Sequence, residues 1–384
     1  MDFNFSDEQR QFRDSLERYV RQAYGFEKRR EIIRSERGYS PEVWQQLAEI
    51  GALAIALPEA HGGFGGGAFD TQLVMEALGR GIVVEPYLAT VVLGAGLIAD
   101  AGSAAQQAEL LPQVAGGELL LALAHGEPGS RYELANVATT ARRDGSDYVL
   151  DGRKAVVLHG DVADRILVSA RTRGAARDAD GVSLFLVDAQ AAGLTRLGYP
   201  TQDGQRAAEL TLSKVRVPQS ALIGTEHAAL PAIEKAQDRA IAALCAEAVG
   251  NMAALIEATV GYLKTRKQFG VAIGSFQALQ HRAVDMYLHA EQARSMAYLA
   301  AAKLDASPDE RRQAISAAKV LVNQSARFVG QQAIQLHGGI GVTDELPVSH
   351  YFKRLTMITM LFGDVDHHLD RFGAGLAASE AAHR

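Results

Sequence analysis

Arg-Lys-Gln-Phe-Gly-Val-Ala-Ile-Gly-Ser-Phe-Gln-Ala-Leu-Gln-His, residues 266–281, is the stretch that decides how this chain folds. It separates two long segments in which apolar residues recur every three or four positions, so two helices are expected to meet here at a tight corner. Gly270 and Gly274 can let the backbone turn, and Ser275 can cap the second helix. The rest of the chain is organised around this corner.

Two polar residues of the corner suggest a ligand. Arg266 and Gln277 bring a cation and an amide together, as a phosphate or nucleotide would require. A surface helix hairpin would carry the same residues, because Arg and Gln are common at solvated helix ends. A second corner favours the ligand: residues 335–341 read Gln-Leu-His-Gly-Gly-Ile-Gly and follow another long helical pattern. Closely spaced glycines suit a backbone that must approach a ligand.

The two corners, in this order and at about this separation, resemble those of the acyl-CoA dehydrogenase family. That family carries an Arg-x-x-Phe-Gly corner and a Gln-x-x-Gly-Gly-x-Gly corner in its C-terminal bundle, and the resemblance covers nearly the whole chain. It implies an FAD that lies across a subunit interface. Arg266 and Gln277 would face its pyrophosphate region. The residues implied to lie against the nucleotide of a neighbouring subunit's flavin are Gln335, Leu336, His337, Gly338 and Gly339.

Patterning divides the chain into three domains, an α+β multidomain fold like that of the family. A capping box at Ser6 and Gln9, and Ser40 before a helical proline, predict an N-terminal helical domain over residues 1–117. Short strand-like runs predict a middle β-domain over 118–224, with turn signals such as Asp144-Gly145 and Asp151-Gly152 between them. Helical patterns return over 225–384, which the resemblance makes a C-terminal four-helix-bundle domain. The predicted strands cover residues 119–123, 148–150, 166–168, 182–187 and 209–212.

Composition excludes several classes of partner. A formal net charge of -6, with no basic run longer than residues 28–30, predicts binding neither to nucleic acid nor to an anionic membrane. The single cysteine, Cys245, cannot form an internal disulfide and lies in an apolar helical run. The N-terminus shows no export signal and no apolar run approaches the ~18 residues of a membrane span, so we expect a cytoplasmic protein without membrane insertion.

The resemblance also implies a reaction. In this family a carboxylate removes the α-proton of an acyl-CoA thioester while the β-hydrogen leaves as hydride to the flavin, and the carboxylate must be poised by burial and oriented donors. Gap-free counting puts the family's Tyr-Glu-Gly-Thr-like tetrad on residues 361–364, with Phe362 in the place of the base. Asp364 is then the candidate base. A second family position falls on Ala240, which leaves Asp238 as the alternate, with Glu247 two turns later.

The middle domain departs from the family pattern too. Of a Thr-Glu-Pro-x-x-Gly-Ser segment beside the flavin, residues 126–132 keep only Glu-Pro, and a Lys-x-Trp-Ile-Thr/Ser segment reads Lys-Ala-Val-Val-Leu over 154–158. The residues implied to reach a neighbour's FAD are present, whereas those implied to hold this chain's own flavin and to take the proton are altered. This pattern is most similar to the small subunits of heteromeric acyl-CoA dehydrogenases, such as those that act on pimeloyl-CoA.

The resemblance therefore predicts an oxidoreductase acting on an acyl-CoA, as a homo- or hetero-oligomer with a family homologue and an electron-transferring flavoprotein as acceptor. Three alternatives stay open: catalysis by Asp364 in this chain, flavin oxidase or monooxygenase chemistry on the same fold, and a non-catalytic binding or partner subunit. No metal site is predicted. The acidic and histidine-rich run 364–370 would need its ligands to converge, and neighbours in a helix point in different directions.

Overall fold

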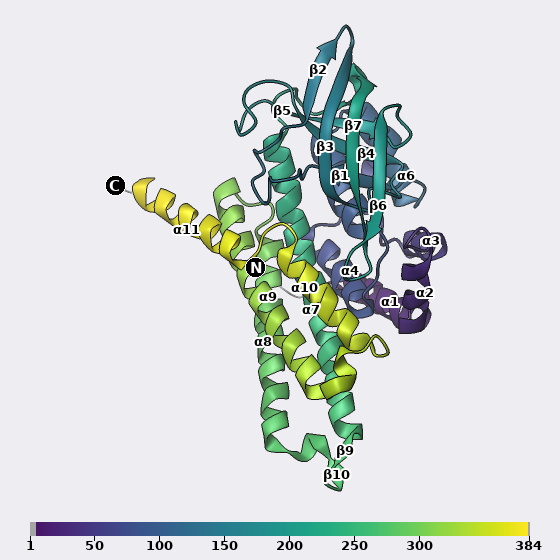
Figure 1. The fold of residues 1–384 in the computed structure, drawn as a ribbon, viewed down its shortest axis with the longest axis vertical. Coiled ribbons are helices and arrows are strands. Elements are labelled where there is room, and N and C mark those ends of the chain that lie inside the picture. The colour runs from purple at the N-terminus through teal and green to yellow at the C-terminus, as the bar shows by residue number, and fades with distance from the viewer. Residues whose placement is uncertain (1–4, 383–384) are drawn as a thin grey trace. The chain divides into compact units, whose positions relative to one another are not determined.

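The computed structural model describes residues 5–382, and Figure 1 labels most of their helices and strands. The chain divides into two compact units. One contains residues 1–31, 68–83 and 241–384 and is helical; the other contains residues 32–67 and 84–240 and carries the sheet. Along the chain, helices come first, strands second and helices again third, as predicted from the patterning. The boundaries of the three predicted domains stay a prediction.

The helical unit is built around one long helix. α9 (Pro308–His337) packs against α8 (Gln277–Ala302), α10 (Pro347–Met360) and α11 (Val365–Ala382). α1 (Asp7–Ala23) packs against α4 (Ala68–Gly81), and the predicted capping box of Ser6 and Gln9 is present at its start. The short α2 (Phe26–Arg34) follows α1.

α7 (Leu230–Thr265) is the longest helix, and its residues from 241 onward belong to the helical unit. Glycines let α4 and α7 cross closely, because a Cβ on Gly79 would lie 2.2 Å from the Glu247 carbonyl oxygen and one on Gly250 would lie 2.0 Å from that of Glu76. α7 is long and apolar enough to cross a membrane by length and composition, but 78% of its most apolar window is buried inside the protein. This burial is that of a core helix.

The second unit holds an eight-stranded sheet in the order β6-β7-β3-β2-β4-β5-β8, with β1 paired to β4. β1 runs parallel to β4 and a single residue pair joins β2 to β4 in parallel, whereas the other neighbours are antiparallel. The bounds are β1 (Leu121–Ala124), β2 (Thr140–Asp144), β3 (Asp147–Leu158), β4 (Arg165–Arg171), β5 (Val182–Asp188), β6 (Leu194–Pro200), β7 (Arg206–Pro218) and β8 (Leu222–Ile223).

Four features of the sheet differ from the sequence prediction. β2, β6 and the two-residue β8 were not predicted as strands. Gly145 turns the β2–β3 hairpin as predicted, with φ +64°, but the predicted turn at Asp151-Gly152 is wrong. These residues lie inside β3, where the register with β7 shifts between Leu150 and Gly152. A glycine can mark a bulge in a strand as readily as a turn.

The unit that carries the sheet also contains several helices. α3 (Pro41–Glu49) starts as predicted, with the Ser40 hydroxyl accepting from Val43 N–H. A π-helical turn η2 (Leu88–Ala95) leads into α5 (Gly96–Ala101), and α6 (Ala104–Ala115) precedes β1. η2 packs against β1, and the Thr90 hydroxyl donates to the Leu121 carbonyl. The short 3-10 turns are η1 (Glu59–His61), η3 (Gln219–Ala221), η4 (Ile273–Ser275) and η5 (Gly338–Val342).

Candidate functional site

The first corner is a small hairpin at the end of α7. β9 (Lys267–Gln268) pairs antiparallel with β10 (Val271–Ala272), and Phe269 and Gly270 form the turn with φ +53° and +83°. Arg266 stands at the base of this hairpin with an exposed side chain. Within residues 5–382 its guanidinium has no hydrogen-bond or ion-pair partner, so it is a cation available to an anionic ligand.

Gln277 is the first residue of α8 and is exposed. The expected cap at Ser275 is wrong: Phe276 occupies the N-cap position without a side-chain bond, and the Ser275 hydroxyl donates to the Ala272 carbonyl at 2.8 Å. Gly274 serves close packing, because a Cβ there would lie 2.9 Å from the Leu263 carbonyl oxygen. The N–H groups at the start of α8 therefore have no side-chain cap.

The second corner ends α9, and the structure brings it beside the first. The His337 ring stacks on Tyr262 of α7, with centroids 4.5 Å apart, and His337 Nδ1 lies 2.8 Å from the Ala333 carbonyl oxygen. Leu336 and His337 are buried, whereas Gln335 is exposed. Burial lowers the pKa of His337. Leu336 and His337 thus anchor the corner, and Gln335 and the glycines after it face outward.

The glycines leave backbone open for a ligand. Gly338 has φ +66° and ψ −145°, a conformation that side chains disfavour, and a Cβ on Gly338 or Gly339 would meet no heavy atom within 4 Å. Together with the unpaired guanidinium of Arg266, this surface suits a phosphorylated nucleotide. The residues present therefore fit the nucleotide end of an FAD.

The loop between α10 and α11 carries the position expected for the base. Phe362 has φ +57°, which is rare for a bulky residue, and Gly363 follows with φ +124°. Asp364 Oδ1 accepts from His367 N–H at 2.9 Å, so this carboxylate caps the start of α11. A phenyl ring cannot take a proton. Asp364 stays a prediction as base, and any proton it took would compete with its cap.

Buried polar side chains hold this loop through its carbonyls. Lys319 Nζ donates to the Ile358 carbonyl, and Asn323 Nδ2 donates to that of Thr359 at 3.1 Å. His368 Nε2 lies 3.1 Å from the Phe362 carbonyl oxygen, which can only accept, so Nε2 carries the hydrogen. Burial lowers the pKa of Lys319 to about 8 and that of His368 to about 3. Buried side chains thus fix the loop, although Phe362 occupies the position expected for the base.

The second family position for a base is occupied by a small residue. Ala240 is fully buried and offers no acidic group, and the alternate Asp238 is also buried. Glu247 faces Arg354 in a buried bidentate ion pair, with Oε1 2.5 Å from Nε and Oε2 2.6 Å from Nη2. Both oxygens of Glu247 accept hydrogen bonds from the Arg354 guanidinium, so this carboxylate has a structural role rather than the role of a base.

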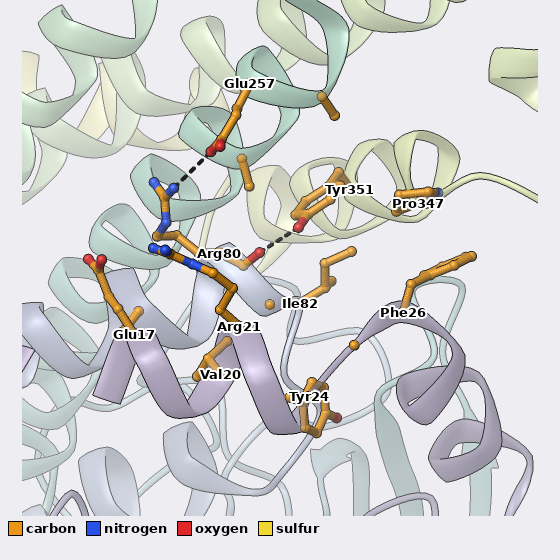
Figure 2. Close-up of a pocket in the computed structure, with 15 residues that line it drawn as sticks. Glu17, Val20, Arg21, Tyr24, Phe26, Arg80, Ile82, Glu257, Pro347 and Tyr351 are labelled. Atoms are coloured by element: carbon orange, nitrogen blue, oxygen red, sulfur yellow. Dashed lines mark hydrogen bonds and ion pairs between the residues drawn. The ribbon is translucent and has the colours of Figure 1, made fainter. Parts of the chain in front are cut away.

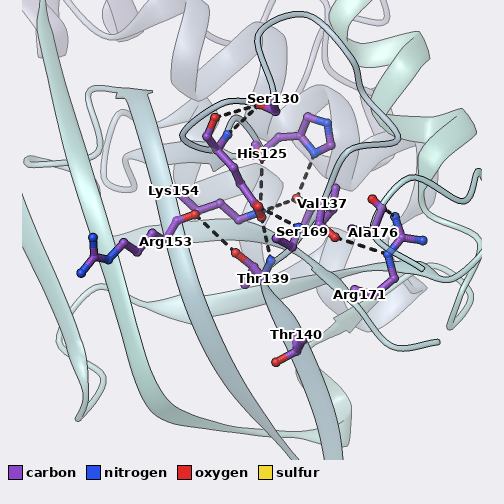
Figure 3. Close-up of polar contacts among 12 residues, drawn as sticks. His125, Ser130, Val137, Thr139, Thr140, Arg153, Lys154, Ser169, Arg171 and Ala176 are labelled. Carbon is purple, nitrogen blue, oxygen red and sulfur yellow. Dashed lines mark hydrogen bonds and ion pairs between the residues drawn. The ribbon is translucent and has the colours of Figure 1, made fainter. Parts of the chain in front are cut away.

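In the other unit, the segment after β1 is fixed by a buried ion pair (Figure 3). Lys154 Nζ lies 2.6 Å from Glu127 Oε1 and 3.0 Å from Ser169 Oγ, and His125 Nδ1 lies 2.9 Å from the same hydroxyl. Glu127 also accepts from the N–H groups of Ala138 and Thr139. Burial lowers the pKa of Lys154 to about 8. Glu127 of the Glu-Pro segment and Lys154 of the second segment are therefore structural partners of each other.

The strand expected to wall a flavin ring contains a bulge where its sequence departs from the family pattern. β3 changes register against β7 between Lys154 and Val157, and Val156 sits in this bulge with φ +52° and 51% of its surface exposed. Its N–H donates to Glu209 Oε1 at 3.2 Å, which also accepts from the Tyr199 hydroxyl at 2.7 Å. Val156 is not aromatic and Leu158 has no hydroxyl, so neither supplies the expected contact.

Sequence reasoning missed the groups that hold the backbone. Besides Lys319, Asn323 and His368, it missed Arg171, whose guanidinium donates to the carbonyls of five residues: Ala135, Val137, Ala176, Asp178 and Asp180. A lone charged residue in an apolar helix or strand was the available signal, since burial of a charge requires partners. Across the described part of the chain, no three acidic, His or Cys side chains are placed to hold a metal ion.

Comparisons with known proteins agree over most of the chain. Residues 6–118, 122–215 and 231–377 match the N-terminal, middle and C-terminal domains of acyl-CoA dehydrogenases. The mitochondrial long-chain specific acyl-CoA dehydrogenase of Sus scrofa is 31% identical over 91% of this chain and 81% of that protein.

Two similar solved structures each carry the names of two proteins. The Tcur3481-Tcur3483 steroid ACAD variant has a TM-score of 0.88 at 32% identity, covering 98% of this chain and 99% of that one. The ChsE4-ChsE5 complex from Mycobacterium tuberculosis has a TM-score of 0.88 at 28% identity, with coverage of 98% and 99%. With three family domains in order and the two corners in place, the chain belongs to the acyl-CoA dehydrogenase family of FAD-dependent oxidoreductases.

Proposed function

We propose that this chain is the base-lacking subunit of a heteromeric acyl-CoA dehydrogenase. It completes the flavin site of a homologous partner and relies on that partner for removal of the α-proton. The observation that carries the proposal is Phe362, held at the position of the base by a loop whose carbonyls are bound by buried side chains.

The nearby carboxylates support this division of labour. Asp364 is engaged as the cap of α11, and Glu247 is paired with Arg354. The altered strand around Val156 points the same way, because it lacks an aromatic wall and a hydroxyl for a flavin of its own. Two similar solved structures each carry the names of two proteins, and one of them is named a complex. These observations favour a chain that works with a different partner.

In the proposed assembly this chain's residues act on the partner's cofactor. Arg266 binds the pyrophosphate region as a cation, Gln277 adds an amide donor, and the backbone of Gly338 and Gly339 lies against the nucleotide. The FAD supplies the hydride acceptor. The substrate is an acyl-CoA thioester in the cytoplasm, and an electron-transferring flavoprotein reoxidises the flavin.

The test is purification of the chain alone and with a co-expressed homologue that retains a glutamate base. Alone, the protein should be nearly colourless and should not oxidise acyl-CoA with an artificial electron acceptor. With the homologue it should copurify, carry FAD and turn over. A stoichiometric flavin in the lone chain, bleached by acyl-CoA, would refute the proposal.

One further candidate has a specific observation in its favour. Asp364 is half-buried two residues after Phe362, so a small shift of the loop would make it the base of a complete enzyme. In that case the lone chain is active and the Asp364→Asn variant is not. Oxygen consumption during turnover would separate an oxidase or monooxygenase from a dehydrogenase.

A further inference from the structure

A hollow of about 420 Å³ lies within the helical unit, between α1, α4, α7 and the start of α10 (Figure 2). All of its lining residues belong to that one compact unit. The volume is within the range of small-molecule sites, about 300–1,000 Å³. None of the residues assigned to FAD or to the base lines it.

Apolar side chains form about half of the wall of the hollow. Side chains of every lining helix contribute hydrocarbon or aromatic surface: Val20, Phe26, Ala77, Ile82, Ala254, Ala258 and Pro347. Tyr351 closes one side, and its hydroxyl donates to the Arg80 carbonyl. This combination of apolar walls with a few polar groups is typical of a site for an amphipathic molecule.

The charged residues gather toward one side. Figure 2 shows Arg21 of α1 and Arg80 of α4 extending to the same side of the hollow, with Glu257 of α7 facing Arg80. Arg80 Nη2 lies 3.0 Å from Glu257 Oε2, so that pair is neutral. Glu17, one turn before Arg21, forms no ion pair with it. Among the described residues the Arg21 guanidinium therefore has no carboxylate partner.

We propose that this hollow binds a small amphipathic carboxylate. The carboxylate accepts from the Arg21 guanidinium beside Arg80, and the hydrocarbon body covers the apolar walls. Glu257 is already paired with Arg80, whereas Glu17 lines the hollow and has no ion-pair partner among the described residues. An organic cation is therefore the competing ligand, and a titration with octylamine decides between the two. Arg21 also complements the C-terminal end of α1, but that effect needs only its charge and not a hollow beside it.

The test uses sodium octanoate as the probe, in calorimetric titrations of the full chain. Arg21→Gln should weaken binding at least ~tenfold, equal to about 1.4 kcal/mol. Arg10→Gln is the matched control, because Arg10 lies on the same helix but pairs with Asp7 outside the hollow. It should bind like the unaltered chain.

A second variant tests the walls. Ala258→Leu fills part of the hollow and should weaken octanoate binding without changing the melting temperature of the free protein. Octanamide, which lacks the charge, should bind weakly and equally to the unaltered chain and to Arg21→Gln. The proposal would be overturned if octanoate did not bind, or if it bound with the same affinity to the unaltered chain and to both variants. Stronger binding of octylamine or of inorganic phosphate than of octanoate would also overturn it.

Discussion

At the scale of single residues, Gly338 and Gly339 are expected to be glycines for different reasons. Gly338 is required by its backbone conformation, whereas Gly339 is required only by the proposed ligand. Gly338 has a positive φ, so an alanine there is strained by about 1–3 kcal/mol. Gly339 has no such φ, and an added Cβ meets no atom of the chain. Gly339→Ala should therefore change the free energy of unfolding by less than ~0.5 kcal/mol. It should nevertheless lower the FAD content of the assembly, because the methyl group occupies the surface proposed for the nucleotide.

Denaturant unfolding and the absorbance of released flavin measure the two effects. Gly338→Ala gives the comparison, since it should lower both stability and flavin content. Normal flavin content in Gly339→Ala would remove this corner from the cofactor site.

His368 predicts a pH dependence of stability. Its native pKa is lowered to about 3 by burial, whereas an unfolded histidine titrates near ~6.5. Between these values the unfolded state binds a proton that the native state does not, so stability falls as pH falls, by at most about 1.4 kcal/mol per unit. His368→Gln should flatten the loss of stability between pH ~6.5 and ~4 in urea unfolding. The exposed His281→Gln should leave it unchanged; equal slopes in both variants would contradict the assignment.

At the scale of elements, Asp364 of the α10–α11 loop has two candidate roles, as the cap of α11 and as the catalytic base. Asp364→Asn keeps an oxygen that can accept from His367 N–H but cannot act as a base, so α11 should keep its stability. Asp364→Ala loses the cap and should cost about 1 kcal/mol. If the partner supplies the base, the assembly with Asp364→Asn should keep its turnover. Loss of turnover with unchanged unfolding would instead make Asp364 the base.

The same scale shows what sequence could predict. Local rules succeeded where the causes are local: the capping box of α1, the Ser40 cap of α3, and the apolar strands β4 and β5. β2 was missed because most of its residues are polar and exposed, and β6 because it is an edge strand ending in Gly-Tyr-Pro. Pairing with neighbours, rather than composition, makes these segments strands.

In the candidate site, too, features carried by local motifs were predicted from the sequence, and features that depend on tertiary packing were not. Both glycine corners were predicted as ligand surfaces from their motifs, and the stacking of His337 on Tyr262 brings them together. The groups that hold the loop at Phe362 were not predicted. Lys319 and Ile358 are 39 positions apart, so nothing local to Lys319 shows that its amine meets that carbonyl. Burial of charges is decided by tertiary packing, which a single sequence does not display.

At the scale of the whole molecule, exposed apolar residues support an oligomer. Phe269 is 91% exposed, and Val284, Tyr287 and Leu288 of α8 are each more than half exposed. These residues belong to the hairpin and to the helix that follows it, beside Arg266. Large exposed apolar side chains close in sequence favour burial against another chain. The surface proposed to reach a partner's flavin is thus continuous in sequence with one that favours association.

This continuity predicts that Arg266 binds the FAD of the partner subunit rather than stabilising its own chain. Arg266→Gln removes an exposed, unpaired cation, so the unfolding free energy of this chain should stay within ~0.5 kcal/mol. Copurification with the homologue should persist, because the apolar surface is untouched. The FAD content of the complex should fall and recover at high added FAD, since a charge-assisted bond to phosphate is worth about 1.5–3 kcal/mol. Lys264→Gln, exposed in the last turn of α7, should keep its flavin. Equal flavin retention in both variants would place the pyrophosphate away from this corner, whereas loss of copurification would show that Arg266 serves the interface itself.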